Sequence, residues 1–234
     1  MAPAESREKA LFGAVKRVYS FWGSTGLYDL GTSLTFLFRQ NGIRRRMVHR
    51  SFLDRGDRVL DLCCGTGLNF THLIEKVGPR GEIVGLDYTR PMLGQAKRRC
   101  ERKNWRNVRL IQGDASRACL RDHSFDAVVS MLGISAVPQY KAALAHAVRM
   151  CRDGGRVVIA DGHPFRGVFA PLNVVMVPIY RWLASWDERK DIIGELKRLL
   201  GDLSVEWYNG GTIYIAAGAK KGEPVEDLKG ISRG

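Results

Sequence analysis

The feature that most constrains the fold is a regular alternation of short β-rich runs with helical patterns, which begins at residue 58. The β-rich runs cover residues 58–63, 82–87, 107–112, 125–131 and 156–161. Helical patterns at 92–103 and 141–151 lie between them, and the second ends at Asp153-Gly154-Gly155, which is typical of a helix stop followed by a turn. Such alternation predicts an α/β fold, with a doubly wound and mostly parallel sheet.

The last part of the chain has a different pattern. Residues 203–208 and 212–219 are typical of two strands, joined at Asn209-Gly210-Gly211 by a hairpin-type turn. Because no helix separates these strands, we expect them to pair antiparallel at one edge of the sheet.

Length and composition fit one globular domain, since 234 residues with 45% hydrophobic side chains can bury a full core. The net charge of +13 indicates affinity for something acidic, such as nucleic acid, a phosphorylated metabolite or an anionic membrane surface. No basic stretch followed by an apolar one begins the chain, and the five cysteines form no CxxC pair. We therefore expect a cytoplasmic protein with free thiols.

A glycine turn follows the first predicted strand, in Val59-Leu60-Asp61-Leu62-Cys63-Cys64-Gly65-Thr66-Gly67. Ligands of open parallel sheets bind at the carboxyl ends of the strands, and glycine lets the backbone approach a ligand closely. A dinucleotide fingerprint would need a small residue where Phe70 stands. A tight turn without a ligand remains the simpler alternative.

Acids recur at the ends of the first three predicted strands. Asp87 ends the second strand, where a carboxylate can accept hydrogen bonds from both hydroxyls of a ribose. Asp114, in Gln112-Gly113-Asp114-Ala115, follows the third strand and could receive an adenine amino group. Each acid could instead cap a turn or a helix, and it is the common register that favours a ligand site.

These segments, with Gly85-Leu86-Asp87, Phe125-Asp126 and Asp153-Gly154-Gly155-Arg156, resemble the class I methyltransferases over residues 55–165. The resemblance implies S-adenosylmethionine as cofactor. It also implies a Rossmann-like doubly wound seven-stranded sheet that is mostly parallel, with an antiparallel terminal strand. In the family pattern the glycine turn meets the methionine part, the acid at Asp87 holds the ribose, and the acid at Asp114 contacts adenine. The candidate cofactor residues are Asp61, Cys63, Gly65, Gly67, Asp87, Tyr88, Met92, Asp114, Ala115 and Met131.

The residues after the fourth strand, Met131-Leu132-Gly133-Ile134-Ser135, bear on the acceptor. They contain no Asn/Asp-Pro-Pro-aromatic motif, no Pro-Cys nucleophile and no acid that could hold a metal, so a lipid or small-molecule acceptor gains weight. The chain is most similar to the ubiquinone/menaquinone C-methyltransferases and the bacterial phospholipid N-methyltransferases. Gly133-Ile134-Ser135-Ala136 departs from the quinone group's Gly-Leu-Arg-Asn, while Tyr28-Asp29 resembles a Tyr-Asp of the phospholipid group. Both acceptors stay open.

Two apolar segments suit an acceptor that resides in a membrane. A basic amphipathic helix pattern near residues 9–22 can lie on an anionic bilayer or pack on its own domain. Residues 167–186 are too short and too broken by proline to span a bilayer, and either a lid or a buried core helix fits them.

We expect a helical cap at 1–50, a methyltransferase domain at 51–220 with a lid-like insertion at 163–190, and a flexible tail at 221–234.

Three residues are candidates for removing a proton from the acceptor: His163, Tyr19 and Tyr28. Each could instead be a loop or packing residue.

An RNA methyltransferase is one alternative function, because many basic residues lie between residues 90 and 109. However, no accessory RNA-binding domain fits this length, and nucleic acid is not favoured as a partner. A cofactor-binding module without catalysis is the other alternative. The sequence leaves the oligomeric state open.

Overall fold

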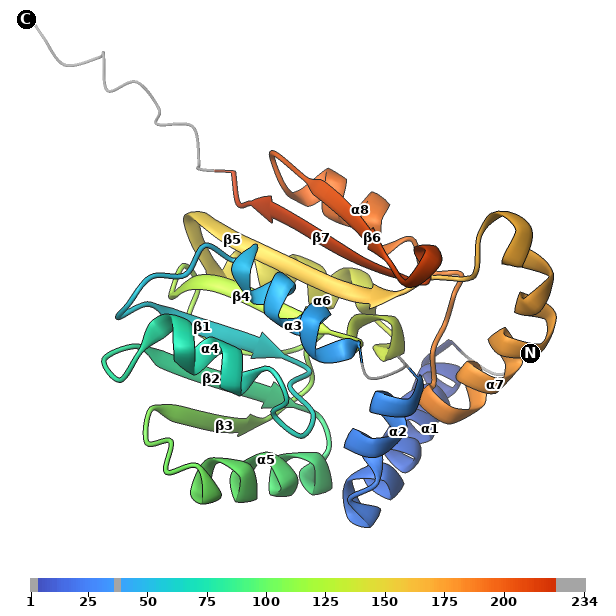
Figure 1. Cartoon of the computed structure of the whole chain (residues 1–234), viewed down its shortest axis with the longest axis horizontal. Helices are drawn as coiled ribbons and strands as arrows, with labels where there is room; N and C mark the ends of the chain where they lie inside the picture. The colour runs from blue at the N-terminus through green and yellow to red at the C-terminus, as the bar shows by residue number, and fades with distance from the viewer. Residues whose placement is uncertain (1–3, 36–38, 222–234) are drawn as a thin grey trace, which may run out of the picture.

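The computed structural model describes residues 4–35 and 39–221 of the chain. Its centre is a seven-stranded sheet in the order β3-β2-β1-β4-β5-β7-β6 (Figure 1). The strands are β1 (Arg58–Leu62), β2 (Glu82–Asp87), β3 (Val108–Gln112), β4 (Phe125–Met131), β5 (Cys151–Gly162), β6 (Ser204–Tyr208) and β7 (Ile213–Ala219).

The pairing confirms the predicted α/β fold. The pairs β1–β2, β2–β3, β1–β4 and β4–β5 are parallel, whereas β7 runs antiparallel to both β5 and β6. The terminal hairpin therefore forms one edge of the sheet, as its two consecutive strands predicted.

Helices cover both faces of the sheet, which explains the nearly continuous apolar runs of β1 and β4. Ile43, Leu73 and Ala96 belong to the apolar core on one face, to which α3 (Gln40–His49), α4 (Phe70–Val77) and α5 (Arg90–Arg102) contribute. The core on the other face includes Leu144 and Leu196, from α6 (Tyr140–Met150) and α8 (Ile192–Leu199). The fold is thus doubly wound.

The junction of α6 and β5 differs from the sequence expectation. The helix ends at Met150, and β5 starts at the next residue, so Asp153-Gly154-Gly155 lies inside the strand and not in a separate turn. The pairing of β5 with β4 shifts register between Phe125 and Ala127, and Gly154 has a φ of +71°. This irregular segment lets the chain leave the helix and join the sheet without a separate loop.

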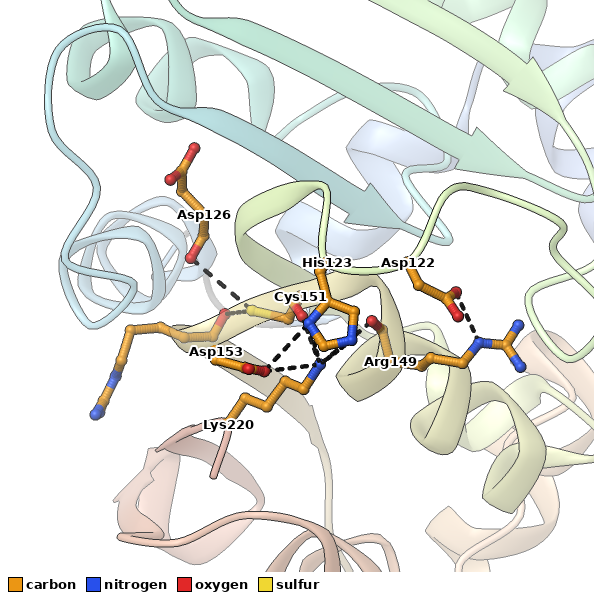
Figure 2. A network of polar contacts seen from close by, with 8 residues as sticks. Asp122, His123, Asp126, Arg149, Cys151, Asp153 and Lys220 are labelled. Carbon is orange, nitrogen blue, oxygen red and sulfur yellow. Dashed lines mark hydrogen bonds and ion pairs between the residues drawn. The ribbon is translucent and has the colours of Figure 1, made fainter. Parts of the chain in front are cut away.

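A polar network fixes Lys220, just after β7, to the start of β5 (Figure 2). The Nζ atom of Lys220 donates to the carbonyl oxygen of Cys151 at 2.9 Å and lies 3.3 Å from Oδ1 of Asp153. The ring of His123 lies against the same ammonium group. Burial raises the pKa of the Cys151 thiol to about 12, so the thiol stays protonated at neutral pH.

The amino-terminal helices gather at the carboxyl ends of the parallel strands (Figure 1). Helix α1 (Ala4–Thr25) packs against α5, and its Gly23 fits so closely that a Cβ there would lie 2.7 Å from the backbone nitrogen of Met92. Helix α2 (Tyr28–Thr35) follows it, whereas α3 packs on α4 and β5 as part of the sheet's covering layer. Residues 1–3 and 36–38 of the expected cap, and 222–234 of the expected tail, lie outside the described residues.

The apolar segment at 167–186 forms the 3₁₀ turn η2 (Gly167–Leu172) and helix α7 (Asn173–Ala184), which project from the sheet (Figure 1). Neither element has a buried residue, so the alternative of a core helix is wrong. The 18 residues Gly167–Ala184 are numerous and apolar enough to cross a membrane, judged by length and composition alone. However, α7 reaches only about 18 Å at 1.5 Å per residue, short of the roughly 30 Å of a bilayer core.

Candidate functional site

The glycine turn at the end of β1 has the open conformation that its sequence predicted. Cys63, Gly65 and Gly67 all have positive φ angles, of +58°, +55° and +76°. A Cβ built on Gly65 meets no atom within 4 Å, so space lies in front of the turn. At Gly67 a Cβ would lie 2.5 Å from the ring of Phe70, which explains this glycine by packing.

Asp87 is held at the tip of β2 beside that turn. Its Oδ2 accepts a hydrogen bond from the backbone N–H of Gly65 at 2.8 Å, and its Oδ1 accepts from the N–H and the hydroxyl of Thr89, both at 2.9 Å. Burial raises the pKa of the carboxyl, and these hydrogen bonds oppose that shift. The backbone of Tyr88 adds a further hydrogen bond, so the carboxylate is held firmly at the end of β2.

The remaining candidate cofactor residues follow β2 and β3 or end β4. The ring centroid of Tyr88 lies 5.8 Å from that of Phe12 in α1, and Met92 is buried in α5. Oδ1 of Asp114 accepts from the N–H and the hydroxyl of Ser116, at 2.8 and 2.7 Å, as a turn-capping acid does. Ala115 and Met131 are buried.

Asp61 is a fully buried acid within β1, close to the turn. Its Oδ1 accepts from the side-chain amide of Asn69 at 2.9 Å, whereas its Oδ2 is buried without a hydrogen-bond partner among residues 4–35 and 39–221. Burial raises the pKa of Asp61 to about 7. A buried carboxyl oxygen that accepts no hydrogen bond lowers the free energy of unfolding. The position of Oδ2 therefore fits a ligand that donates a hydrogen bond to it.

Two neighbours of this acid were missed by sequence reasoning. Arg44 of α3 donates to Oδ1 of Asn69 at 2.6 Å, and Asn69 in turn holds Asp61. Neither residue belongs to one of the motifs described above. Arg44 comes from a helix that precedes β1, and Asn69 follows the glycine turn. Only the docking of α3 beside the turn brings them together.

Asp29, at the start of α2, ties the amino-terminal helices to the glycine turn. Its carboxylate accepts from the hydroxyl of Thr66 at 2.6 Å and forms an ion pair with Arg99 of α5. Nε of Arg99 also donates to the carbonyl oxygen of Thr66 at 2.9 Å. Arg99 belongs to the basic stretch that motivated the RNA alternative, and it is used here inside the molecule.

A second buried acid, Asp161, lies near the end of β5. Its carboxylate accepts from the N–H and the hydroxyl of Ser135, at 2.9 and 2.7 Å, and from the N–H of Gly162 at 2.8 Å. Nζ of Lys190 donates to the carbonyl oxygens of Ser135 and Val137, at 2.5 and 2.8 Å. Burial raises the pKa of Asp161 and lowers that of Lys190, and the network fixes the loop after β4. These residues carried no sequence signal for a site.

A cavity of about 500 Å³ opens beside this loop, enclosed by α1, α2, α7, the ends of β4 and β5, and the hairpin turn. Its walls are mostly apolar and aromatic. The structure brings all three sequence-predicted catalytic candidates, Tyr19, Tyr28 and His163, into this one cavity. The aromatic residues around them, which sequence reasoning did not assign to the cavity, are Trp22, Phe165, Tyr180 and Trp186.

The two tyrosines and the histidine differ in what they can do. Burial raises the pKa of Tyr19 well above its usual value and that of Tyr28 to about 12, so both hold their protons at neutral pH. Tyr19 donates its hydroxyl hydrogen to the carbonyl oxygen of Ala184 at 2.9 Å. Nδ1 of His163 lies 2.8 Å from the carbonyl oxygen of Pro164, which assigns the ring hydrogen to Nδ1 and leaves the lone pair on Nε2.

Helix α7 is held at both ends as one wall of the cavity. At its start, the side-chain amide of Asn173 makes two hydrogen bonds with the backbone of Phe165, at 2.8 and 2.9 Å. At its end, Nε1 of Trp22 donates to the carbonyl oxygen of Leu183 at 2.9 Å, next to the bond from Tyr19. The amino-terminal helix thus caps carbonyl groups that α7 cannot satisfy itself.

Comparison with known proteins agrees with this arrangement. The family described as methyltransferase domain matches residues 59–155. The demethylmenaquinone methyltransferase of Lactococcus lactis subsp. lactis is 31% identical over 214 residues, which cover 82% of this chain and 85% of that relative.

This chain belongs to the class I S-adenosylmethionine-dependent methyltransferases.

Further matches have the same character. The demethylmenaquinone methyltransferase of Staphylococcus aureus (strain JH9) is 30% identical over 206 residues, covering 79% of this methyltransferase and 85% of the relative. A match to that of Geobacillus sp. covers 67% of this chain and only 64% of the relative's length, at 31% identity. The solved methyltransferase from Aquifex aeolicus has a TM-score of 0.59 at 15% identity, over 75% of this chain and 88% of that one.

The cofactor of this methyltransferase is S-adenosylmethionine, as the sequence resemblance implied. The residues around the glycine turn fit such a group, because the turn faces open space at Gly65 and, within the described part of the chain, one oxygen of Asp61 has no donor. Phosphoethanolamine N-methyltransferase 2 of Haemonchus contortus has a TM-score of 0.66 at 16% identity, over 77% of this chain and 53% of that one. It agrees in fold alone.

Proposed function

We propose that this methyltransferase transfers a methyl group from S-adenosylmethionine to a ring carbon of a reduced, demethylated menaquinone-type quinone. The observation that carries the proposal is the cavity of about 500 Å³ with apolar and aromatic walls at the carboxyl ends of β4 and β5. A flat bicyclic ring can stack on such walls, and the relatives named above support the acceptor class.

We assign the cofactor to the strand ends on the β1 and β2 side of the cavity. Asp61, Cys63 and Gly65 would meet its methionine part, with Gly67 and Met131 shaping the turn and the strand beside it. Asp87 would hold the ribose, and its fixed position beside Gly65 at the end of β2 supports this role. Tyr88, Met92, Asp114 and Ala115 would surround the adenine ring.

When bound, the cofactor supplies an electrophilic methyl group. Methylation at carbon requires an electron-rich ring carbon, and a hydroquinone has such a carbon whereas the oxidised quinone does not. The ring carbon's electron pair forms the new C–C bond, the methyl–sulfur bond breaks with its pair going to sulfur, and the displaced ring hydrogen leaves as a proton. The protein must therefore align the ring, exclude water and accept one proton.

His163 is the residue that we assign to accept this proton. Its Nε2 carries the free lone pair, because Nδ1 donates to the backbone at Pro164, and the residue lines the cavity. Trp207 packs edge-on against the imidazole at 5.1 Å and fixes its orientation. Tyr19 and Tyr28 keep their protons, and they would instead position the ring and close the amino-terminal wall.

We place the enzyme in the cytoplasm, at the surface of the membrane in which a lipid-tailed quinone resides. The cavity has room for a ring but not for a long apolar tail in addition. The tail would remain outside, so methylation requires the cavity mouth to reach the bilayer.

The test uses the full chain, S-adenosylmethionine with a labelled methyl group, and a short-tailed demethylated quinone that dissolves in water. We expect label in the methylated quinone only when the acceptor is chemically reduced. His163→Gln should lower kcat by about 100-fold with cofactor affinity unchanged. His146→Gln on α6, outside the cavity, is the matched control. Label in a phospholipid from a lipid extract, and none in the quinone, would reject the acceptor; a fully active His163→Gln would reject the base.

A further inference from the structure

Helix α7 is apolar on two opposite sides, and only one of them has a partner in the described chain. One stripe, which includes Met176, Val177, Tyr180 and Leu183, lines the cavity. The other consists of Val174, Val175, Ile179 and Trp182, and none of these residues lines the cavity. A helix that packs on its own domain normally presents a polar outer side.

The outward stripe is highly exposed. Val174 is 80% exposed and Trp182 is 77% exposed, and η2 continues the surface with Val168, which is 87% exposed. Phe169 and Leu172 of η2 are also exposed. We call these seven residues of η2 and α7 the outward surface. A contiguous apolar surface of this kind marks a place where another apolar phase or molecule docks.

The charges near the outward surface are cationic. From residue 166 to residue 186 the chain has two charged residues, Arg166 and Arg181, and Arg181 forms an ion pair with Glu188, which follows α7. Helix α1, which packs against α7, adds exposed Lys16 and Arg17 at the same end of the molecule (Figure 1). The acids of α1 are Glu5 and Glu8, which precede Lys9 in its sequence, and Asp29 of α2 contacts Thr66 and Arg99.

From these observations we propose that the outward surface docks into an anionic lipid bilayer, and that α7, as one wall of the acceptor cavity, brings the cavity mouth to the membrane surface. Apolar side chains flanked by arginine and lysine suit the boundary between acyl chains and acidic headgroups. A second copy of the chain fits less well, because a two-fold contact would bring the same cationic surface against itself. This inference rests on the proposed function only for the nature of the acceptor that enters the cavity from the membrane.

The experiment is flotation of the full chain with vesicles of phosphatidylcholine alone or of phosphatidylcholine mixed with phosphatidylglycerol. The chain should float with the mixed vesicles, less at high salt and less with phosphatidylcholine alone. Val174→Asp combined with Trp182→Asp should lower the vesicle partition coefficient by about tenfold or more, because two apolar side chains are lost from the interface.

The matched control is Phe52→Asp. Phe52 is 57% exposed, precedes β1 at the amino ends of the parallel strands, and has a φ of +51°, which aspartate tolerates. It introduces one aspartate, against two in the double variant, at an exposed apolar residue away from α7, and vesicle binding should stay as in the unmodified chain.

Methylation of the short-tailed, water-soluble quinone separates docking from catalysis. The double variant should retain this activity while it loses activity on the quinone embedded in vesicles. Vesicle binding that depends on the outward surface in a protein that methylates no quinone would uphold the docking surface and reject only the proposed function. No flotation of the unmodified chain, unchanged binding of the double variant, or a dimer in solution that the same substitutions dissociate would overturn the docking surface.

Discussion

The contact between α1 and α7 can be weakened without altering the shape of either helix. In the variant Tyr19→Phe with Trp22→Phe, the aromatic packing is largely kept, but the hydrogen bonds to the carbonyl oxygens of Ala184 and Leu183 are lost. A typical intramolecular hydrogen bond contributes about 0.5–1.5 kcal/mol net, so the pair contributes roughly 1–3 kcal/mol to closure of the wall. With RT near 0.6 kcal/mol, the open state becomes about 5- to 150-fold more populated.

Hydrogen exchange of the backbone amides in α7 measures this opening directly. We expect exchange in α7 to accelerate within that range, while amides of α6 keep their protection. Because burial raises the pKa of Tyr19 well above its usual value, the hydroxyl stays a donor, and the effect should be the same from pH 6 to pH 8.

The control for this prediction is Tyr208→Phe, which removes a tyrosine hydroxyl that bonds to Glu206 on β6. Exchange in α7 should not change in this control. If the double variant also leaves α7 exchange unchanged, then Tyr19 and Trp22 do not hold the wall, and our account of α7 closure is wrong.

Three further predictions concern the strand ends. Asp87→Asn should weaken cofactor binding by about 10- to 100-fold in calorimetry, since one charge-assisted acceptor is lost; affinity within threefold of the original would contradict the ribose assignment. The pKa of Asp61 is about 7 in the folded chain and about 3.9 unfolded, so the free energy of unfolding should fall by up to about 4 kcal/mol as pH rises from 4 to 7. Asp61→Asn should remove this slope in denaturant titrations, and a flat profile for the unmodified chain would refute the burial argument. Gly67→Ala should lower unfolding free energy by about 2–4 kcal/mol because its Cβ meets the ring of Phe70, whereas Gly65→Ala, facing open space, should cost only about 1 kcal/mol; equal losses would contradict the packing difference.

Much of the fold could be predicted from local patterns. The period of the apolar residues and the glycine turns indicated the five central strands and the terminal hairpin, because these signals depend on near neighbours in the chain. Where prediction failed, as at Cys151, a packed strand replaced the expected turn. The start of β5 is decided by its pairing with β4, which local sequence does not report.

The candidate site divides in the same way. Asp61, Gly65 and Asp87 were recognisable because a parallel sheet brings the carboxyl ends of consecutive strands to one edge. Arg44 and Asp161 were not, since their functional neighbours lie 25 or more residues away along the chain.

The sequence by itself predicted the class of fold from periodicity, and its resemblance to the class I methyltransferases implied the cofactor. The strand ends that we propose for the cofactor follow from short motifs. Only the tertiary structure decided what α1 and α7 do. Both segments were apolar enough to be core, cap or membrane surface, and the choice depends on which of their sides finds a partner. The structure places one side of α7 over the acceptor cavity and leaves the other without a partner in the described chain, and it is this asymmetry that points to the bilayer.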